Sequence, residues 1–176
     1  MKQQYIRHIP LILIILHLFS CSNFTDSTNV EIVKPTQEEL IRINQQLVQK
    51  DKKDIESFVK LKLWDMLISD SGLWYMTINE GDGEIVKTNQ SVKINYKVLL
   101  LDGTKLYSSE ATGPKSFTVG SGYVEKGLEE GILLMRKGTK MRFIMPPHLA
   151  HGLIGDGEKI PARATLIYEV ELLSKQ

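Results

Sequence analysis

The clearest structural pattern of this chain lies in residues 91–107, Ser-Val-Lys-Ile-Asn-Tyr-Lys-Val-Leu-Leu-Leu-Asp-Gly-Thr-Lys-Leu-Tyr. Apolar and polar residues alternate along their first half, with the apolar positions at Val92, Ile94, Tyr96 and Val98. A strict alternation predicts a strand that buries one face. The Asp102-Gly103 pair then predicts a tight hairpin, and the return strand begins at Leu106 and Tyr107.

Three further stretches extend this sheet. Residues 74–78 alternate large side chains and run into a Gly-rich turn at residues 80–83. Residues 139–145 and 165–173 show a similar alternation of apolar positions. The strands are short and joined by turns, which predicts a largely antiparallel sheet.

One short helix is predicted between these strands, at residues 124–135. Its apolar residues recur at helical spacing, at Val124, Leu128, Ile132 and Met135. Gly127 and Gly131 lie where a side chain would hold the helix away from a sheet. The sequence therefore predicts an α+β domain, in which one helix lies across an antiparallel sheet.

An N-terminal helical segment precedes the sheet. Residues 36–39, Thr-Gln-Glu-Glu, form a capping box that starts a helix at Thr36. Apolar residues then recur every three or four positions, at Leu40, Ile43, Leu47, Ile55, Val59 and Leu63. The charged stretch at residues 50–54 interrupts this spacing. The segment is one long helix or two short ones ending near Trp64, and the interruption favours two.

Two roles fit this helical segment. It is either an appendage that packs on its own domain or a dimerisation arm formed by residues 37–64. The apolar stripe is narrow and short for a coiled coil, which favours the appendage.

The first residues resemble an export signal. Lys2 and Arg7 form a basic start, and an apolar run of about ten residues follows within residues 9–19. A membrane-spanning helix needs about 20 apolar residues, so a signal peptide at residues 1–20 is the better interpretation. Ser20 and Cys21 end a stretch that resembles the lipobox of bacterial lipoproteins, which implies a lipid on Cys21.

The predicted location follows from this signal. Residues 21–35 are polar and predict a tether between the lipid and the domain. The protein is expected to be exported and lipid-anchored to the bacterial envelope, facing the periplasm or the cell surface. Ser22 favours the outer membrane under the sorting rule of enteric bacteria.

Composition excludes several classes of function. The 176 residues include 22 basic and 21 acidic side chains, so no charge imbalance argues for nucleic acid as a partner. Cys21 is the only cysteine, which excludes an intrachain disulfide and a zinc site built from cysteines.

The sequence also lacks the common catalytic motifs. It contains no Gly-rich phosphate loop, no Gly-x-Ser-x-Gly and no His-Glu-x-x-His. His148 and His151 follow two prolines and are interpreted as loop histidines rather than metal ligands. We expect no cofactor and no metal, which leaves a site made of apolar and aromatic side chains.

Several motifs follow one another in a characteristic order. They are residues 92–96, 101–104, 108–109, 119–120, 124–131, 137–138 and 160–173. Together they resemble the FKBP-type peptidyl-prolyl cis-trans isomerase family, roughly from residue 88 to residue 175. With the lipobox and the helical lead-in, the whole chain is similar to lipoprotein FKBPs of the Bacteroidetes, among them gliding-motility-associated isomerases.

This resemblance implies an FKBP-like antiparallel half-barrel of five or six strands, wrapped on the short helix, with the substrate pocket between helix and sheet. The implied catalytic residues are Tyr96, Val124, Glu125, Leu128, His151 and Tyr168. The implied substrate-binding residues are Leu106, Tyr107 and Phe117. Leu128 would form the floor under the prolyl ring, and the backbone N–H of Glu125 would donate to a substrate carbonyl.

The sequence departs from the family pattern at five of these positions. The family usually has an aromatic residue, Asp, Ile, Trp and Tyr where this chain has, in turn, Leu106, Tyr107, Glu125, Leu128 and His151. The missing Trp removes contact area and stacking from the floor of the pocket. His151 could replace the missing tyrosine hydroxyl as a hydrogen-bond donor.

Three functions are consistent with these observations. The first is a lipid-anchored isomerase that acts on proline-containing polypeptides during folding. The second is an FKBP-fold chaperone or binding module with little or no catalysis. The third is a subunit of an envelope assembly that docks through residues 37–64.

The implied organisation is a signal peptide at 1–20, a tether at 21–35, a helical segment at 36–69, a lead-in strand and turn at 70–87 and an isomerase domain at 88–176.

Overall fold

A computed structural model describes residues 34–175 of the chain. Within these residues the main sheet has seven strands in the order β1-β2-β8-β9-β4-β5, and β6 also pairs with β4. All of these pairings are antiparallel. The strands are β1 (Leu67–Ile68), β2 (Trp74–Asn79), β4 (Ser91–Leu100), β5 (Lys105–Ser108), β6 (Lys115–Thr118), β8 (Lys140–Met145) and β9 (Leu166–Lys175).

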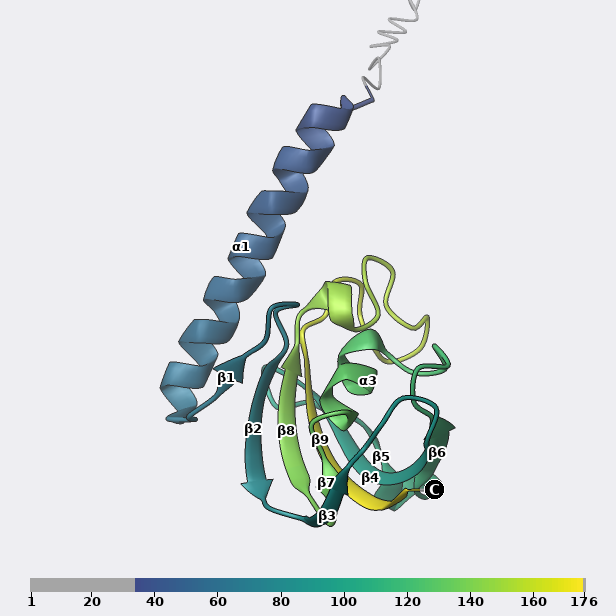
Figure 1. Cartoon of the computed structure of the whole chain (residues 1–176). Helices are drawn as coiled ribbons and strands as arrows, with labels where there is room; N and C mark the ends of the chain where they lie inside the picture. Colours follow the sequence, from purple (N-terminus) through teal and green to yellow (C-terminus); the bar gives the residue numbers. More distant parts are fainter. Residues whose placement is uncertain (1–33, 176) are drawn as a thin grey trace, which may run out of the picture. The chain divides into compact units, whose positions relative to one another are not determined.

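The centre of the sheet is formed by β4 and β9, which pair along almost their whole length. The sheet curves around α3 (Lys126–Ile132), as Figure 1 shows. A second, two-stranded sheet joins β3 (Asp82–Ile85) to β7 (Arg136–Lys137). Short helices α2 (Ser109–Thr112) and η1 (Pro147–Leu149) lie in the connections. The predicted α+β fold, with an antiparallel sheet around one short helix, is confirmed.

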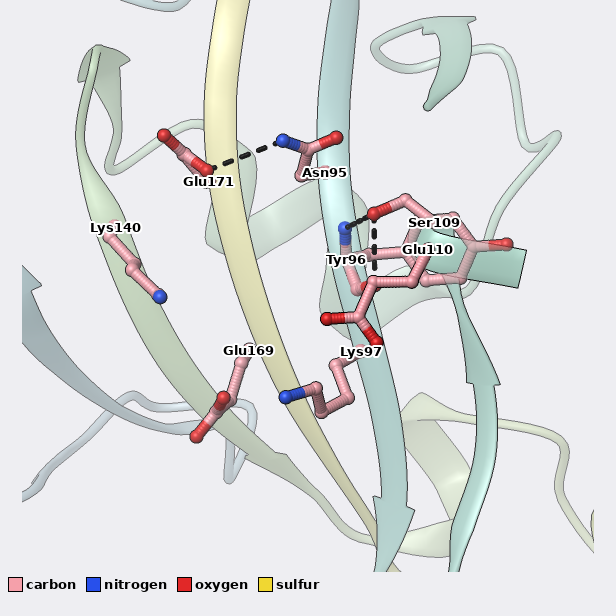
Figure 2. Close-up of a pocket in the computed structure, with 8 residues that line it drawn as sticks. All are labelled: Asn95, Tyr96, Lys97, Ser109, Glu110, Lys140, Glu169 and Glu171. Carbon is pink, nitrogen blue, oxygen red and sulfur yellow. Dashed lines mark hydrogen bonds between the residues drawn. The ribbon is translucent and has the colours of Figure 1, made fainter. Parts of the chain in front are cut away.

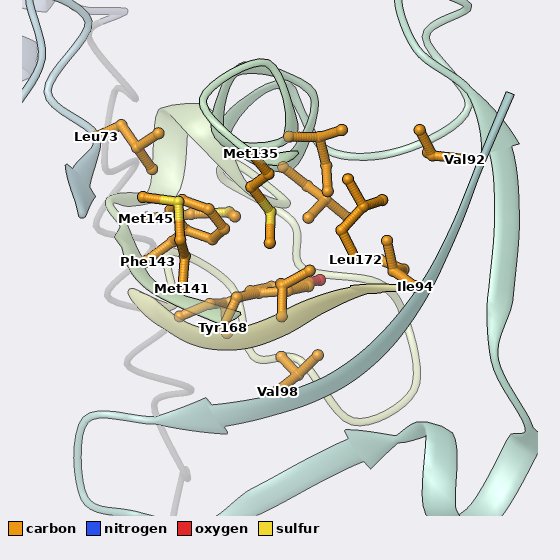
Figure 3. Close-up of a cluster of buried hydrophobic side chains, with 14 of the residues drawn as sticks. Leu73, Val92, Ile94, Val98, Met135, Met141, Phe143, Met145, Tyr168 and Leu172 are labelled. Atoms are coloured by element: carbon orange, nitrogen blue, oxygen red, sulfur yellow. The ribbon is translucent and has the colours of Figure 1, made fainter. Parts of the chain in front are cut away.

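Two glycines let α3 approach the sheet closely. A Cβ atom at Gly131 would lie 2.6 Å from the ring of Phe143 on β8, and one at Gly127 would lie 2.9 Å from the side chain of Met145. Real Cβ atoms do not come so near, so any side chain at either position would push the helix outward. Figure 3 shows the core beneath the helix, to which β8 and β9 contribute Phe143 and Tyr168.

The N-terminal segment forms a single helix, α1 (Gln37–Lys62), so the expectation of two helices is wrong. The predicted capping box at Thr36 and Glu39 is present. The helix continues through residues 50–54 because their side chains pair one turn apart, as in Lys50–Asp54 and Lys52–Glu56. The three lysines of this stretch are also good helix formers, and an interrupted apolar spacing does not break a helix.

The C-terminal half of α1 packs on the outer face of the sheet. Ile55 and Val59 are buried in a cluster with Ile144 of β8 and Ile167 of β9. The helix ends at Leu63, whose φ of 54° places it in the left-handed region. Residues 67–68, which the sequence placed in the helical segment 36–69, instead form strand β1.

The predicted signal peptide, Cys21 and most of the predicted tether lie outside the described residues. Among the residues that are described, no helix is both long enough and apolar enough to cross a membrane.

Candidate active site

A cavity of about 220 Å³ lies at the inner face of the sheet beside the N-terminus of α3. The sheet supplies one wall, because alternate residues of β4 point inward. Loops that precede α3 and follow η1 supply the other walls. The lining residues are Tyr96, Val98, Tyr107, Lys115, Glu125, His151, Asp156, Ile160 and Tyr168.

The carboxylate of Glu125 is the polar centre of this cavity. Its Oε1 accepts a hydrogen bond from the hydroxyl of Tyr168 at 2.5 Å and lies 2.8 Å from Nε2 of His151. Burial opposes ionisation of this carboxyl. Other interactions outweigh burial and lower the pKa of Glu125: the hydrogen bond from Tyr168, a hydrogen bond from its own backbone N–H, the positive charge of Lys115 and the hydrogen bond with His151. Glu125 is therefore an ion that fixes the ring of Tyr168 in place.

The pKa of Tyr168 shifts in the opposite direction to that of Glu125. Burial, followed by the negative charge of Glu125, raises the pKa of the Tyr168 hydroxyl well above its ordinary value. The hydroxyl therefore stays protonated and donates to the carboxylate across the pH range in which proteins fold. The aromatic face of Tyr168 remains available as an apolar wall.

A second tyrosine–carboxylate pair closes another side of the cavity. The hydroxyl of Tyr107 on β5 donates to Oδ2 of Asp156 at 2.5 Å. The hydrogen bond to Asp156 raises the pKa of Tyr107 to about 12, and the same bond lowers the pKa of Asp156 to about 2. Oδ1 of Asp156 also accepts from the backbone N–H groups of Glu158 and Ile160, so this side chain organises its loop.

Five residues implied by the resemblance line the cavity together: Tyr96, Tyr107, Glu125, His151 and Tyr168. Four others do not line it. Val124 packs against the core, and the side chains of Leu106, Phe117 and Leu128 belong to that core. Leu128 is not among the residues that line this cavity, and its role as a floor under the prolyl ring stays a prediction.

Sequence reasoning missed four lining residues: Val98, Lys115, Asp156 and Ile160. The alternation that places Tyr96 on the inner face also places Val98 there, so this residue could have been found. Asp156 and Ile160 lie in a Gly-rich loop without periodicity, and Lys115 begins a short strand. Their positions depend on contacts between distant segments, which no local pattern records.

The two histidines have different partners. Nε2 of His148 lies 2.9 Å from the carbonyl oxygen of Ser71, whereas His151 faces Glu125. Across residues 34–175, no group of three or more His, Cys, Asp or Glu side chains is arranged to hold a metal ion.

A second hollow, of about 260 Å³, lies on the opposite face of the sheet (Figure 2). It is lined mainly by the outward-pointing residues of β4, β8 and β9, and most of these are charged or polar. Asn95 donates to Glu171 across it at 3.4 Å, and Ser109 accepts from the backbone N–H of Tyr96 at 3.1 Å. A prolyl ring would lose water contacts here without gaining an apolar partner, so the inner cavity is the better candidate.

Comparisons with known proteins identify the family of this chain. The family described as FKBP-type peptidyl-prolyl cis-trans isomerase matches residues 83–173. A probable FKBP-type isomerase of Haemophilus influenzae is 33% identical over 84% of this chain and 60% of its own length. The isomerase FkpA of Escherichia coli is 38% identical over 70% of this chain and 44% of its own. The FK506-binding protein 1A of Neurospora crassa is 41% identical over 58% of this chain and 87% of its own.

Solved structures show the same likeness. The crystal structure of FkpA from Escherichia coli superposes with a TM-score of 0.63 and 30% identity, over 81% of this chain and 74% of that chain. The crystal structure of AtFKBP13 has a TM-score of 0.61 and 32% identity, over 64% of this chain and 99% of that chain. The chain spans only about half of the length of the bacterial relatives that it matches.

Proposed function

Since this chain belongs to the FKBP-type peptidyl-prolyl cis-trans isomerase family, we propose that it catalyses cis-trans isomerisation of X-Pro bonds in exported polypeptides. The observation that carries the proposal is the inner cavity, where Tyr96, Val98, Ile160 and Tyr168 offer apolar and aromatic surface to a prolyl ring. A cavity of about 220 Å³ is large enough for such a ring and too small for a folded surface.

Catalysis in such a cavity needs no general base. Rotation about an X-Pro bond must overcome amide resonance, with a barrier of about 18–20 kcal/mol, and no covalent bond is made or broken. An apolar wall favours the twisted imide, which is less polar than the planar form. A thousandfold acceleration requires about 4 kcal/mol of such preference.

The residues of the cavity divide this work between them. The rings of Tyr96 and Tyr168 would hold the prolyl ring while the preceding carbonyl turns. The backbone N–H of Glu125, the residue that caps α3, would donate to a substrate carbonyl in place of its own carboxylate. The ionised side chain of Glu125 keeps Tyr168 in the orientation that this arrangement needs.

The test is the isomerisation of a Leu-Pro tetrapeptide by residues 22–176, measured by NMR exchange. We expect acceleration by the wild-type protein, retention within about threefold in Tyr168→Phe, and a loss of about tenfold or more in Tyr168→Ala. Removal of a buried ring costs about 3–5 kcal/mol of stability, so circular dichroism must confirm that each variant is folded. Tyr96→Ala, at a half-buried position of the same cavity, provides a second variant with less risk of unfolding.

A binding module without useful catalysis is the second candidate. The buried carboxylate of Glu125 favours it, because a charge beside an apolar pocket works against a less polar twisted imide. The same assay separates the two candidates. A folded wild-type protein that gives no rate above background, yet binds the peptide, has the second function.

The proposal includes a location in the cell. We propose a lipid on Cys21, an anchor in the bacterial envelope, most simply the outer membrane, and membership of the lipoprotein branch of the family. The support is the sequence of residues 1–21, with its basic start, its apolar run of about ten residues and the Ser20-Cys21 pair.

We also propose that α1 associates with a second copy or with an envelope partner. Its N-terminal half keeps large apolar side chains exposed, at Leu40, Ile41, Ile43 and Val48. The buried residues of α1 are confined to Ile55 and Val59 in its C-terminal half. Exposed apolar residues gathered on one element indicate a surface that binds another protein.

A further inference from the structure

Arg163 lies at the base of a loop that lines the inner cavity. Its backbone N–H donates to the carbonyl oxygen of Gly152 at 3.0 Å, which closes the loop of residues 152–163. This loop contributes Asp156 and Ile160 to the lining of the cavity. The shape of the cavity therefore depends on how the loop is held against the domain.

The loop has little apolar packing that could fix its position. Ile160 is the only buried residue among residues 152–163. The side-chain hydrogen bonds of the loop to other elements go in two directions. Those on one side reach β5, as in the bond from the hydroxyl of Tyr107 to Asp156. Those on the other side reach α1 and are made by Arg163.

The contact with α1 is an ion pair between Arg163 and Asp51. Nη2 of Arg163 donates to both carboxylate oxygens of Asp51, at 3.1 and 2.8 Å. The Asp51 side chain is 14% exposed, so solvent screens this pair less than a fully exposed one. Within the described part of the chain, no other hydrogen bond or ion pair joins α1 to residues 65–175. The one directional contact of α1 with the rest of the domain thus falls on the loop of the cavity.

The backbone at Arg163 gives independent support for a specific role of its side chain. Its φ of 57° lies in the left-handed region, which Gly, Asn and Asp adopt more readily than Arg. Strain of this kind persists where the surrounding structure holds the residue in place, and it is concentrated at functional sites. The two hydrogen bonds to Asp51 give a reason for an arginine at this position.

We propose that Arg163, held by Asp51 of α1, is a positioning residue of the isomerase. It keeps the loop of residues 152–163 in the place where Asp156 and Ile160 line the cavity. The inference rests on the proposed function. Without the ion pair, the loop would leave the cavity for part of the time, and only molecules with the loop in place would bind substrate. The apparent affinity would fall by that fraction, whereas bound substrate would hold the loop in place and so preserve turnover at saturation.

The experiment removes the ion pair from either side. The full-length wild-type protein, Asp51→Ala and Arg163→Asn are assayed with a Leu-Pro tetrapeptide. We expect each variant to raise KM about fivefold and to keep kcat within about twofold. Alanine favours a helix and asparagine tolerates the left-handed region, so neither substitution strains the backbone. The double variant should behave like either single variant, because all three lack the same contact.

Two further variants serve as controls. Asp54→Ala removes another acid of α1, whose partner Lys50 lies in the same helix, and should leave KM unchanged. Arg163→Lys keeps a cation, and one nitrogen makes both bonds in the wild-type protein, so KM should stay within about twofold of the wild-type value. A purely structural defect would instead reduce the amount of folded protein, and therefore kcat, with KM unchanged.

Amide hydrogen exchange measured by NMR tests the same inference without activity. In Asp51→Ala, the amides of Ile160 and Arg163 should exchange at least about fivefold faster, while that of Val170 in β9 stays unchanged. An unchanged KM in Asp51→Ala, or an equal rise in Asp54→Ala, would overturn the positioning role. If the wild-type protein gives no rate on the tetrapeptide, the proposed function fails and exchange alone decides. Equal exchange at Ile160 and Arg163 in wild type and Asp51→Ala then overturns the inference.

Discussion

The side chain of Glu125 links the chemistry of the cavity to the stability of the fold. Burial raises the pKa of Glu125, but the hydrogen bond from Tyr168 together with the backbone, Lys115 and His151 outweighs burial, so the pKa in the folded protein is lower than the ordinary value of 4.5. The folded state therefore binds this proton less readily than the unfolded chain. The ion contributes stability above pH 4.5, and this contribution is lost as the pH falls through the folded pKa.

Glu125→Gln should reveal this contribution. The amide keeps the size of the side chain but replaces a charged acceptor with a neutral one. Hydrogen bonds to charged groups are worth about 1.5–3 kcal/mol each, roughly twice as much as neutral ones. We expect a loss of about 1–3 kcal/mol in the free energy of unfolding at pH 7, measured in urea, and a smaller difference at pH 4.

The control for this substitution is Glu84→Gln, because the Glu84 side chain is 80% exposed. It should change stability by less than about 0.5 kcal/mol at either pH. A difference between wild type and Glu125→Gln that stays constant from pH 7 to pH 4 would show that the carboxylate charge does not stabilise the fold.

Single residues also show where sequence reasoning succeeds. Gly127 and Gly131 could be placed at the contact between helix and sheet, because both the helical spacing and the need for a small residue are local. The role of the Glu125 side chain could not be predicted. Its partners Tyr168 and His151 are 43 and 26 positions away, and only the folded sheet brings them together.

Among the elements, α1 shows the limit of reading periodicity alone. The apolar stripe is interrupted at residues 50–54, yet the helix continues, because the charged residues there pair with each other one turn apart. Strands were easier to predict, since the alternation in β4 and β9 follows directly from a sheet with one buried face.

The exposed stripe of α1 leads to a prediction about assembly. Residues 22–176 should sediment as a dimer at micromolar concentration, and Leu40→Glu with Ile43→Glu should give a monomer, because buried acids oppose an apolar interface. Helix content and tetrapeptide isomerisation should stay unchanged. Gln46→Glu, an exposed polar position on the same half of α1, serves as the control.

The outcome of this sedimentation experiment decides the role of α1. A wild-type protein that remains monomeric at tens of micromolar contradicts self-association. In that case we expect the apolar residues of α1 to bind an envelope partner. The relevant measurement is then whether deletion of residues 37–64 abolishes the complex with that partner.

At the scale of the whole molecule, the predicted anchor would place catalysis close to a membrane. A tether of residues 21–35 spans at most about 50 Å when fully extended. Clients would therefore meet the cavity soon after export, while their X-Pro bonds still isomerise slowly.

Cys21→Ser tests this arrangement. In a bacterial host grown with labelled palmitate, the wild-type protein should carry the label and sediment with membranes, whereas Cys21→Ser should be unlabelled and remain in the soluble exported fraction. Stable anchoring needs two or more acyl chains, and all of them would depend on Cys21. Because Cys21 is the only cysteine, its loss removes the whole attachment. Both forms should isomerise the tetrapeptide equally well, because Cys21 precedes the residues that form the cavity. Label in Cys21→Ser, or an unlabelled wild-type protein in the cytosol, would exclude a lipid anchor at this residue.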